Sequence, residues 1–239
     1  MRYAIYFTPS STDALLKIAN NWLGRNAFTG EAVRRPAISG LSVEELDKMT
    51  MSARRYGFHA TIKAPFYLAP DYKEDDLLRA LMHFASSLAP VTLPRLKITA
   101  LGSCFALMLK EPVPALQQLA NDTVTALDKF RAPLSDEDFA RRNPQSLAPA
   151  QLRNLQQWGY PYVFDEFRFH MTLTDKIEEQ DRPKIAGILD HFFAPVLTDS
   201  VEINNLALFV EPEPGAPFEV HSLHPLAKVK VSAPLAGQR

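Results

Sequence analysis

The sequence predicts an α+β protein made of two similar halves, for three reasons. First, a motif occurs twice, at 55–63 (RYGFHATIK) and again at 166–174 (EFRFHMTLT). Second, apolar and polar side chains alternate in both copies, which is typical of a half-buried β-strand. Third, helical and extended segments follow one another in substantially the same order in both halves. We therefore expect one duplicated domain over 1–230, with two lobes formed by repeat units at about 1–102 and 103–226.

Hydrophobic periodicity and turn residues define the elements expected in the first half. They are a strand at 3–7, a helix ending at Gly24, a short helix ending near Met51, the first motif strand closed by Pro65, a helix at about 73–89 and an extended segment at 93–101. Ser11 or Thr12 is expected to cap the first helix, and Ser42 with Glu45 predicts a capping box for the second. The segment 25–40 has no clear period and is expected to form a loop that overhangs a site.

The second half begins with the apolar run 104–109, which indicates a buried strand. The elements expected after it are a helix opening at Pro112 or Pro114, an insertion at 132–162 with a helix at about 149–158, the second motif strand, a helix at about 181–193 and extended segments near 201–210 and 218–223. Pro195 is expected to stop the helix before it, because proline lacks the N–H that would continue the helix. Residues 231–239 are expected to form a frayed tail.

Composition narrows the classes of protein and partner. The 26 basic and 27 acidic side chains leave a formal net charge of −1, so no global field attracts nucleic acid or membrane, and a nucleic-acid partner is not favoured. Cys104 is the one cysteine, which excludes an intrachain disulfide, and its apolar neighbours indicate a buried thiol rather than a nucleophile. No signal-like N-terminus or membrane-length apolar run is present. We therefore expect a cytoplasmic protein and leave its oligomeric state open.

Alternation within the motif places its polar side chains on one face of each strand. Because successive strand side chains point to opposite faces, His59 and Thr61 should share one face, and His170 and Thr172 should do the same. Chance predicts only about 0.3 His-x-Thr pairs in a chain of this composition. A lone copy would be a structural histidine beside a β-forming threonine. The matched repeat instead favours two functional pairs that meet in one cleft.

The same alternation adds three cationic candidates for binding phosphate. Arg55 and Lys63 fall on the His59 face, and Arg168 falls on the His170 face if both strands stay regular. Arg168 is of most interest because a guanidinium interrupts an otherwise apolar alternation two residues before the histidine, and its planar fork matches phosphate oxygens. The alternative, an exposed edge-strand charge or a partner for Glu166, is equally compatible with the sequence.

Other residues near the motifs are weaker candidates for a functional role. Gly57 either leaves space beside His59 or forms a bulge. Four tyrosines are candidates for stacking or hydrogen bonding, although core packing accounts for each more simply: Tyr6, Tyr56, Tyr160 and Tyr162. The remaining histidines have no spacing that suggests a zinc site, and no glycine-rich phosphate loop is present, so we expect neither a metal nor a cofactor.

Two imidazoles facing one cleft suit a reaction that removes one proton and delivers another. Histidine titrates near neutral pH, so one ring can act as base and the other as acid. Threonine hydroxyls on the same faces can donate hydrogen bonds to phosphoryl oxygens. Hydrolysis of a phosphoester needs this set of groups, and the sequence does not say which histidine is the base.

The motifs resemble those of the 2H phosphoesterase superfamily, which His59-Ala60-Thr61-Ile62 and His170-Met171-Thr172-Leu173 both match. More narrowly, five stretches look like a bacterial branch labelled putative phosphonate metabolism proteins: 22–25 (WLGR), 55–61 (RYGFHAT), 130–134 (FRAPL), 158–163 (WGYPYV) and 166–174. The resemblance implies a two-lobed fold, with antiparallel-rich sheets and flanking helices around a central cleft. It also implies metal-independent hydrolysis of a cyclic phosphodiester by both histidines, with both threonines holding the phosphoryl oxygens.

The resemblance leaves the substrate open. Its phosphonate label suggests a small ribose cyclic phosphate, which makes a small-molecule phosphoester the expected substrate of a cyclic phosphodiesterase. Two alternatives remain: an enzyme acting on the 2′,3′-cyclic ends of RNA, as a phosphodiesterase or a ligase, and a catalytically silent module that binds nucleotide or RNA.

Overall fold

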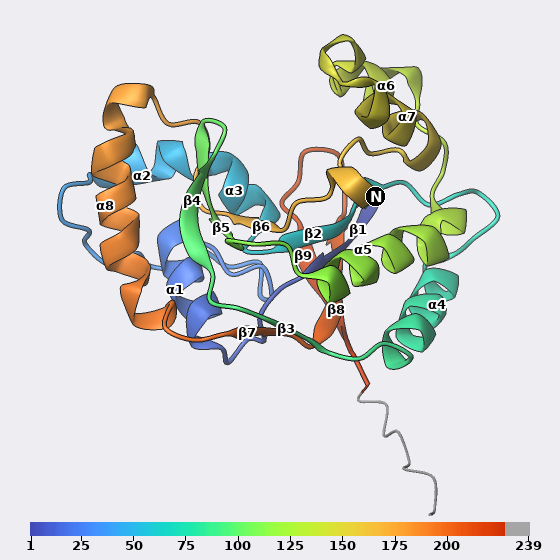
Figure 1. The fold of residues 1–239 in the computed structure, drawn as a ribbon, viewed down its shortest axis with the longest axis horizontal. Helices are drawn as coiled ribbons and strands as arrows, with labels where there is room; N and C mark the ends of the chain where they lie inside the picture. Colours follow the sequence, from blue (N-terminus) through green and yellow to red (C-terminus); the bar gives the residue numbers. More distant parts are fainter. Residues whose placement is uncertain (228–239) are drawn as a thin grey trace, which may run out of the picture.

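The computed structural model describes residues 1–227. The pairs of neighbouring strands within these residues are antiparallel. Seven strands form one sheet in the order β4-β5-β6-β2-β1-β8-β9, and β3 pairs with β7 in a second sheet (Figure 1). The strands are β1 (Arg2–Phe7), β2 (Ala60–Phe66), β3 (Val91–Leu93), β4 (Lys97–Leu101), β5 (Cys104–Met108), β6 (His170–Thr172), β7 (Val201–Ile203), β8 (Asn205–Glu211) and β9 (Glu219–Pro225). The α+β class with antiparallel sheets is therefore confirmed, although the two sheets are very unequal in size.

Eight α-helices flank these strands within the described residues. They are α1 (Ala14–Leu23), α2 (Val43–Met49), α3 (Met51–Tyr56), α4 (Glu74–Ser86), α5 (Pro114–Leu127), α6 (Asp136–Arg141), α7 (Pro149–Trp158) and α8 (Arg182–Phe193). Figure 1 shows α4 and α5 side by side at one end of the sheet, whereas α6 and α7 project beyond it. The predicted capping box of Ser42 and Glu45 is present, but the first helix is capped by Asp13 rather than by Ser11 or Thr12.

The two faces of the large sheet are packed differently. On β1, Tyr3, Ile5 and Phe7 join the main hydrophobic core, together with buried residues of α1, α4, α5 and α8. The alternating residues Ala4 and Tyr6 point to the other face, where they belong to a much smaller cluster. Because helices cover the first face, the second face is the one on which a site can form.

The order of elements is similar in the two halves of the chain, but the halves exchange strands. Strand β4 belongs to the first half but pairs with β5, the first strand of the second half. Strand β8 belongs to the second half but pairs with β1, the first strand of the first half. The motif strands β2 and β6 are neighbours at the centre of the sheet. One continuous sheet therefore joins both halves.

Both motif strands are shorter than the sequence predicted. Residues 51–56 form α3, and β2 begins only at Ala60, because Gly57 ends the helix with a positive φ of 76° and redirects the chain. The second motif contributes only His170–Thr172 to the sheet. Cys104, expected to be buried, is partly exposed at the start of β5.

Two further expectations concern the membrane and the tail. No helix among residues 1–227 is long and apolar enough to cross a membrane. The tail expected at 231–239 lies outside the described residues.

Candidate active site

The two motif strands bring both histidines to the same face of the sheet. Strands β2 and β6 are antiparallel, and Ala60 lies opposite Met171. Both of these residues are buried on the helix-covered face. Since side chains alternate, their neighbours point to the opposite face, with His59 beside Thr172 and Thr61 beside His170. The face predicted from the sequence is therefore formed, and the two motifs meet on it.

The imidazole rings have matching hydrogen bonds. Nδ1 of His59 lies 2.9 Å from the carbonyl oxygen of Gly57, and Nδ1 of His170 lies 2.8 Å from that of Arg168, in each case two residues earlier. A carbonyl oxygen only accepts, so Nδ1 must carry the proton in both rings. The neutral rings therefore leave Nε2 as the atom that can accept a proton.

His59 lies in a tighter environment than a surface histidine. Its ring stacks on Tyr6, with ring centroids 3.9 Å apart and an angle of 24° between the planes. Burial lowers the pKa of His59 to about 4; the hydrogen bond to Gly57 opposes the shift and nearby His170 adds to it. The neutral form of His59 is therefore strongly favoured near pH 7.

A cavity of about 440 Å³ lies against the motif face, and we call it the histidine cleft. Its lining includes Thr61, Arg168 and His170, together with Tyr160 and Tyr162 from the insertion. His59 and Thr172 are not among the residues that line this cleft, but the hydroxyl of Thr61, which does line it, lies 3.3 Å from Nε2 of His59. Arg168 is exposed, so its guanidinium can reach a ligand there. Among residues 1–227, no group of three His, Cys, Asp or Glu side chains is arranged to hold a metal ion.

Lys63 does not lie on the His59 face, contrary to the prediction. The consecutive residues Ile5 and Tyr6 of β1 pair with Lys63 and Thr61, which are two positions apart on β2. Ile62 is therefore an extra residue, a β-bulge, and it reverses the alternation beyond it. Lys63 consequently shares the face of Ile5.

The surroundings of Lys63 agree with this position. Its ammonium group is buried and donates hydrogen bonds to Asp128 at 2.8 Å and to the carbonyl oxygen of Val124 at 3.3 Å. Both partners come from the region of α5 and its end. Lys63 is thus engaged by the helix side of the molecule and away from Thr61.

Arg55 also differs from its predicted position, because it lies in α3 and not on a strand. Its guanidinium bonds to the buried carboxylate of Glu211 and to the carbonyl oxygens of Gly215 and Ala216. The side chain lines a second cavity beside the histidine cleft. Its place in the sequence close to His59 therefore did not predict its position in space.

Sequence reasoning undervalued the tyrosines and missed a polar pair. Tyr6 pairs with Thr61 across β1 and β2, which puts it under His59. Gln151 donates a 2.8 Å hydrogen bond to Glu166, and both line the histidine cleft. These contacts depend on strand order and on how α7 packs, so no local pattern could have revealed them.

Long-range hydrogen bonds hold the two motifs in register. The indole N–H of Trp22 on α1 donates to the carbonyl oxygen of Leu173, 2.8 Å away. The carboxylate of Asp175 accepts from the backbone N–H groups of Ser52 and Ala53, at the start of α3. The segment after the second motif therefore supports the helix that leads into the first.

The fold is an antiparallel α+β fold in which the two motif strands lie side by side at the centre of one sheet. The chain belongs to the family described as "Protein of unknown function (DUF1045)", whose model matches residues 61–219. It is similar to solved structures of Escherichia coli LigT with 3′-AMP (13% identity, TM-score 0.43) and of TT0787 from Thermus thermophilus (18% identity, TM-score 0.45). Each of these comparisons covers 95% of this chain and 98% of the other.

Two curated relatives are named ribose 1,5-bisphosphate phosphokinase PhnN. The protein from Janthinobacterium sp. (strain Marseille) is 38% identical over 221 residues, covering 91% of this chain and 49% of the relative. The protein from Laribacter hongkongensis (strain HLHK9) is 36% identical over 227 residues, covering 92% and 50%. This chain therefore spans about half the length of the curated relatives it matches.

Proposed function

We propose that this chain is a metal-independent phosphoesterase that hydrolyses a small cyclic phosphodiester by paired-histidine acid/base catalysis. The observation that carries the proposal is the matched orientation of His59 and His170, each fixed through Nδ1 on adjacent strands. Two rings held in this way can act on the two sides of one phosphorus centre.

The lowered pKa of His59 supports assigning it as the base. Its Nε2 would take a proton from water while the water oxygen bonds to phosphorus. Protonated His170 would give its Nε2 proton to the ester oxygen as the P–O bond breaks, which leaves a phosphomonoester and a free hydroxyl. Thr61 and Thr172 would donate hydrogen bonds to the phosphoryl oxygens, and Arg168 would balance their charge.

The relatives' name suggests the kind of substrate. Those proteins are named for a phosphorylated ribose, and we propose a ribose cyclic phosphate, in phosphonate metabolism, for this chain. The relatives' name also states a kinase activity, which we do not propose for this chain, because its sequence contains no glycine-rich phosphate loop.

The first test is turnover in the presence of a chelator. The panel comprises 2′,3′-cyclic nucleotides, ribose 1,2-cyclic phosphate and an oligoribonucleotide with a cyclic end. We expect hydrolysis of a small cyclic phosphate, and a loss of about 10²–10⁴-fold in kcat for His59→Ala and for His170→Ala, the range typical of a lost acid or base. Circular dichroism should show both variants folded.

A matched control is His191→Ala, because His191 is exposed on α8 and is not among the residues that line the histidine cleft. It should retain wild-type turnover. Full activity in either motif variant would refute the mechanism. Binding of nucleotide without any turnover would favour the silent module instead.

A further inference from the structure

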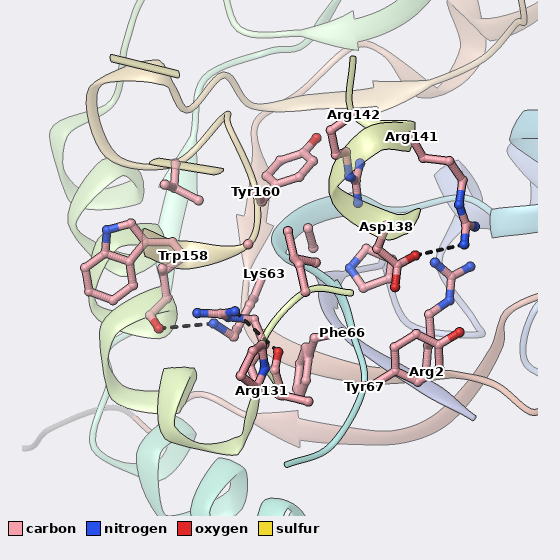
Figure 2. Close-up of a pocket in the computed structure, with 18 of the residues that line it drawn as sticks. Arg2, Lys63, Phe66, Tyr67, Arg131, Asp138, Arg141, Arg142, Trp158 and Tyr160 are labelled. Atoms are coloured by element: carbon pink, nitrogen blue, oxygen red, sulfur yellow. Dashed lines mark hydrogen bonds and ion pairs between the residues drawn. The ribbon is translucent and has the colours of Figure 1, made fainter. Parts of the chain in front are cut away.

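A second cavity, of about 430 Å³, has six cationic side chains on its lining, and we call it the arginine cavity (Figure 2). The mechanism proposed above uses none of these cations. They are Arg2, Arg55, Lys63, Arg131, Arg141 and Arg142. Asp138 is the one carboxylate on the lining formed by residues 1–227.

One group of these cations shares a single buried carboxylate. Glu211 on β8 is buried, and its two oxygens bond to Arg2 and to Arg55. Burial is the largest single effect and would raise the pKa of Glu211, but the hydrogen bonds from Arg2 and the backbone N–H of Gly215, together with the charges of Arg2 and Arg55, lower it overall. One negative charge therefore faces two guanidinium groups, which leaves an excess of positive charge.

A second group repeats this arrangement. Asp128 bonds to Lys63 at 2.8 Å and to Arg131 at 2.8 Å and 2.9 Å. Burial opposes ionisation of Asp128, yet the hydrogen bonds from Arg131 and Lys63 hold its pKa below the usual value. Here too, one carboxylate neutralises only one of two cations.

The helix α6 brings two more arginines to the cavity rim. Arg141 bonds to Asp138 at 3.0 Å and, more weakly, to exposed Glu137 at 3.3 Å. Arg142 lies over the ring of Tyr160, 5.1 Å from its centroid, and forms no ion pair with a carboxylate among residues 1–227. Figure 2 shows Arg142 beside Tyr160 on the side of the cavity opposite Arg131. Its guanidinium is thus held by stacking, and its N–H groups have no hydrogen-bond acceptor within the described part of the chain.

The arginine cavity adjoins the histidine cleft. Tyr160 lines both of them. Tyr56 lines the arginine cavity, and its ring centroid is 6.1 Å from that of His59. On β1, Arg2 alternates onto the same face as Tyr6, about 13 Å further along the strand. A ligand at the histidines can therefore extend past Tyr160 toward Arg142 and Arg2, while Lys63 lines the same cavity from the helix-covered face.

We propose that the arginine cavity binds a second phosphate group, a phosphomonoester on the same substrate whose cyclic phosphate lies at the histidines. This proposal rests on the proposed function and narrows it to a cyclic sugar phosphate that also carries a terminal phosphate. A guanidinium fork matches phosphate oxygens, and a phosphomonoester carries a charge of about −1.5 to −2 at neutral pH, which suits the uncompensated positive charge.

The names of the curated relatives are compatible with this substrate class, since ribose 1,5-bisphosphate is a sugar with phosphates at two positions. RNA is a less suitable occupant. The chain has a formal net charge of −1, and the cations gather in a cavity of limited volume rather than along an extended track.

The experiment compares ribose 1,2-cyclic phosphate with its 5-phosphorylated form. In the wild type, the 5-phosphate should raise kcat/KM at least about tenfold, the effect expected of a charge-assisted hydrogen bond. Arg142→Gln should reduce this preference about 10- to 100-fold. Since Arg142 forms no ion pair with a described residue, the variant should fold normally. The control Arg153→Gln removes an exposed arginine of α7 and should leave the preference unchanged.

Equal kcat/KM for the two substrates, with no effect of Arg142→Gln, would overturn the proposal. The proposal would also be overturned if Arg142→Gln lowered kcat/KM only for an oligoribonucleotide, because the cavity would then bind RNA. A binding measurement separates this proposal from the proposed function. Ribose 5-phosphate should bind more tightly than ribose in titration calorimetry, and Arg142→Gln should abolish the difference. Tighter binding of ribose 5-phosphate supports the phosphate site even if neither cyclic substrate is hydrolysed. Equal binding of ribose and ribose 5-phosphate counts against the phosphate site.

Discussion

At the scale of single residues, the site depends on what each histidine ring contacts. Both rings donate through Nδ1 to a backbone carbonyl, but among residues 1–227 only His59 is stacked on a buried tyrosine. The two motifs look equivalent in sequence and yet provide different environments. In the proposed mechanism, this difference would let two identical side chains take opposite roles in one reaction.

The lowered pKa of His59 also has a consequence for stability. An unfolded chain binds a proton at this position below about pH 6.5, whereas the folded chain resists protonation down to about pH 4. The wild type should therefore lose stability as the pH falls through this window and be unaffected by His59 above it. Between pH 7.5 and 5, urea unfolding should show about 1–2 kcal/mol more loss for the wild type than for His59→Gln, allowing for partial exposure of the ring.

The same measurement on His191→Gln provides the control, because His191 is exposed on α8. That variant should follow the wild-type pH dependence closely. If His59→Gln also follows it, the low pKa of His59 is not a property of the folded protein.

At the scale of elements, the turn between α3 and β2 positions His59. Gly57 has a φ of 76°, and a Cβ at this position would lie 2.6 Å from the Cβ of Ala27. Gly57→Ala should therefore destabilise the fold by about 1–3 kcal/mol. Turnover should also fall, since the carbonyl oxygen of Gly57 orients the His59 ring. Denaturant unfolding and kcat together measure both effects.

Gly187 offers the matched comparison. It is exposed within α8, and a Cβ added there meets nothing within 4 Å. Gly187→Ala should stabilise the protein by about 0.5–1 kcal/mol through helix propensity and leave turnover unchanged. A neutral Gly57→Ala would show that the turn tolerates a side chain and does not constrain the histidine.

At the scale of the whole molecule, the exchanged strands should make the two halves fold together. Strand β8 pairs with β1 over five residues and β4 pairs with β5, so each half completes the sheet of the other. We predict one cooperative unfolding transition, with the same midpoint by circular dichroism and by tryptophan fluorescence. Trp22 and Trp158 report on different halves. A fragment of residues 1–102 should not fold alone, and two separated transitions would contradict this prediction.

Much of the fold could be predicted from local patterns. The helix at 149–158, the capping box at Ser42 and most strand segments follow from periodicity and turn residues, because those signals act between residues close in sequence. The motif strands were predicted too long. Gly57 could equally mark a bulge or a bend in the sequence, and its clash with Ala27 exists only in the folded chain.

The sequence by itself determined the α+β class, the two His-x-Thr pairs and the face each pair shares, since all three follow from side-chain periodicity. Only the tertiary structure decided where the cationic side chains lie relative to these pairs. Because of the bulge at Ile62, Lys63 lies on the helix-covered face. Arg55 lines the arginine cavity, where it forms an ion pair with the buried carboxylate of Glu211. Arg142 reached the same cavity through the packing of α6. The positions of these cations depend on strand register and on contacts between distant segments, and no short stretch of the sequence determines either of them.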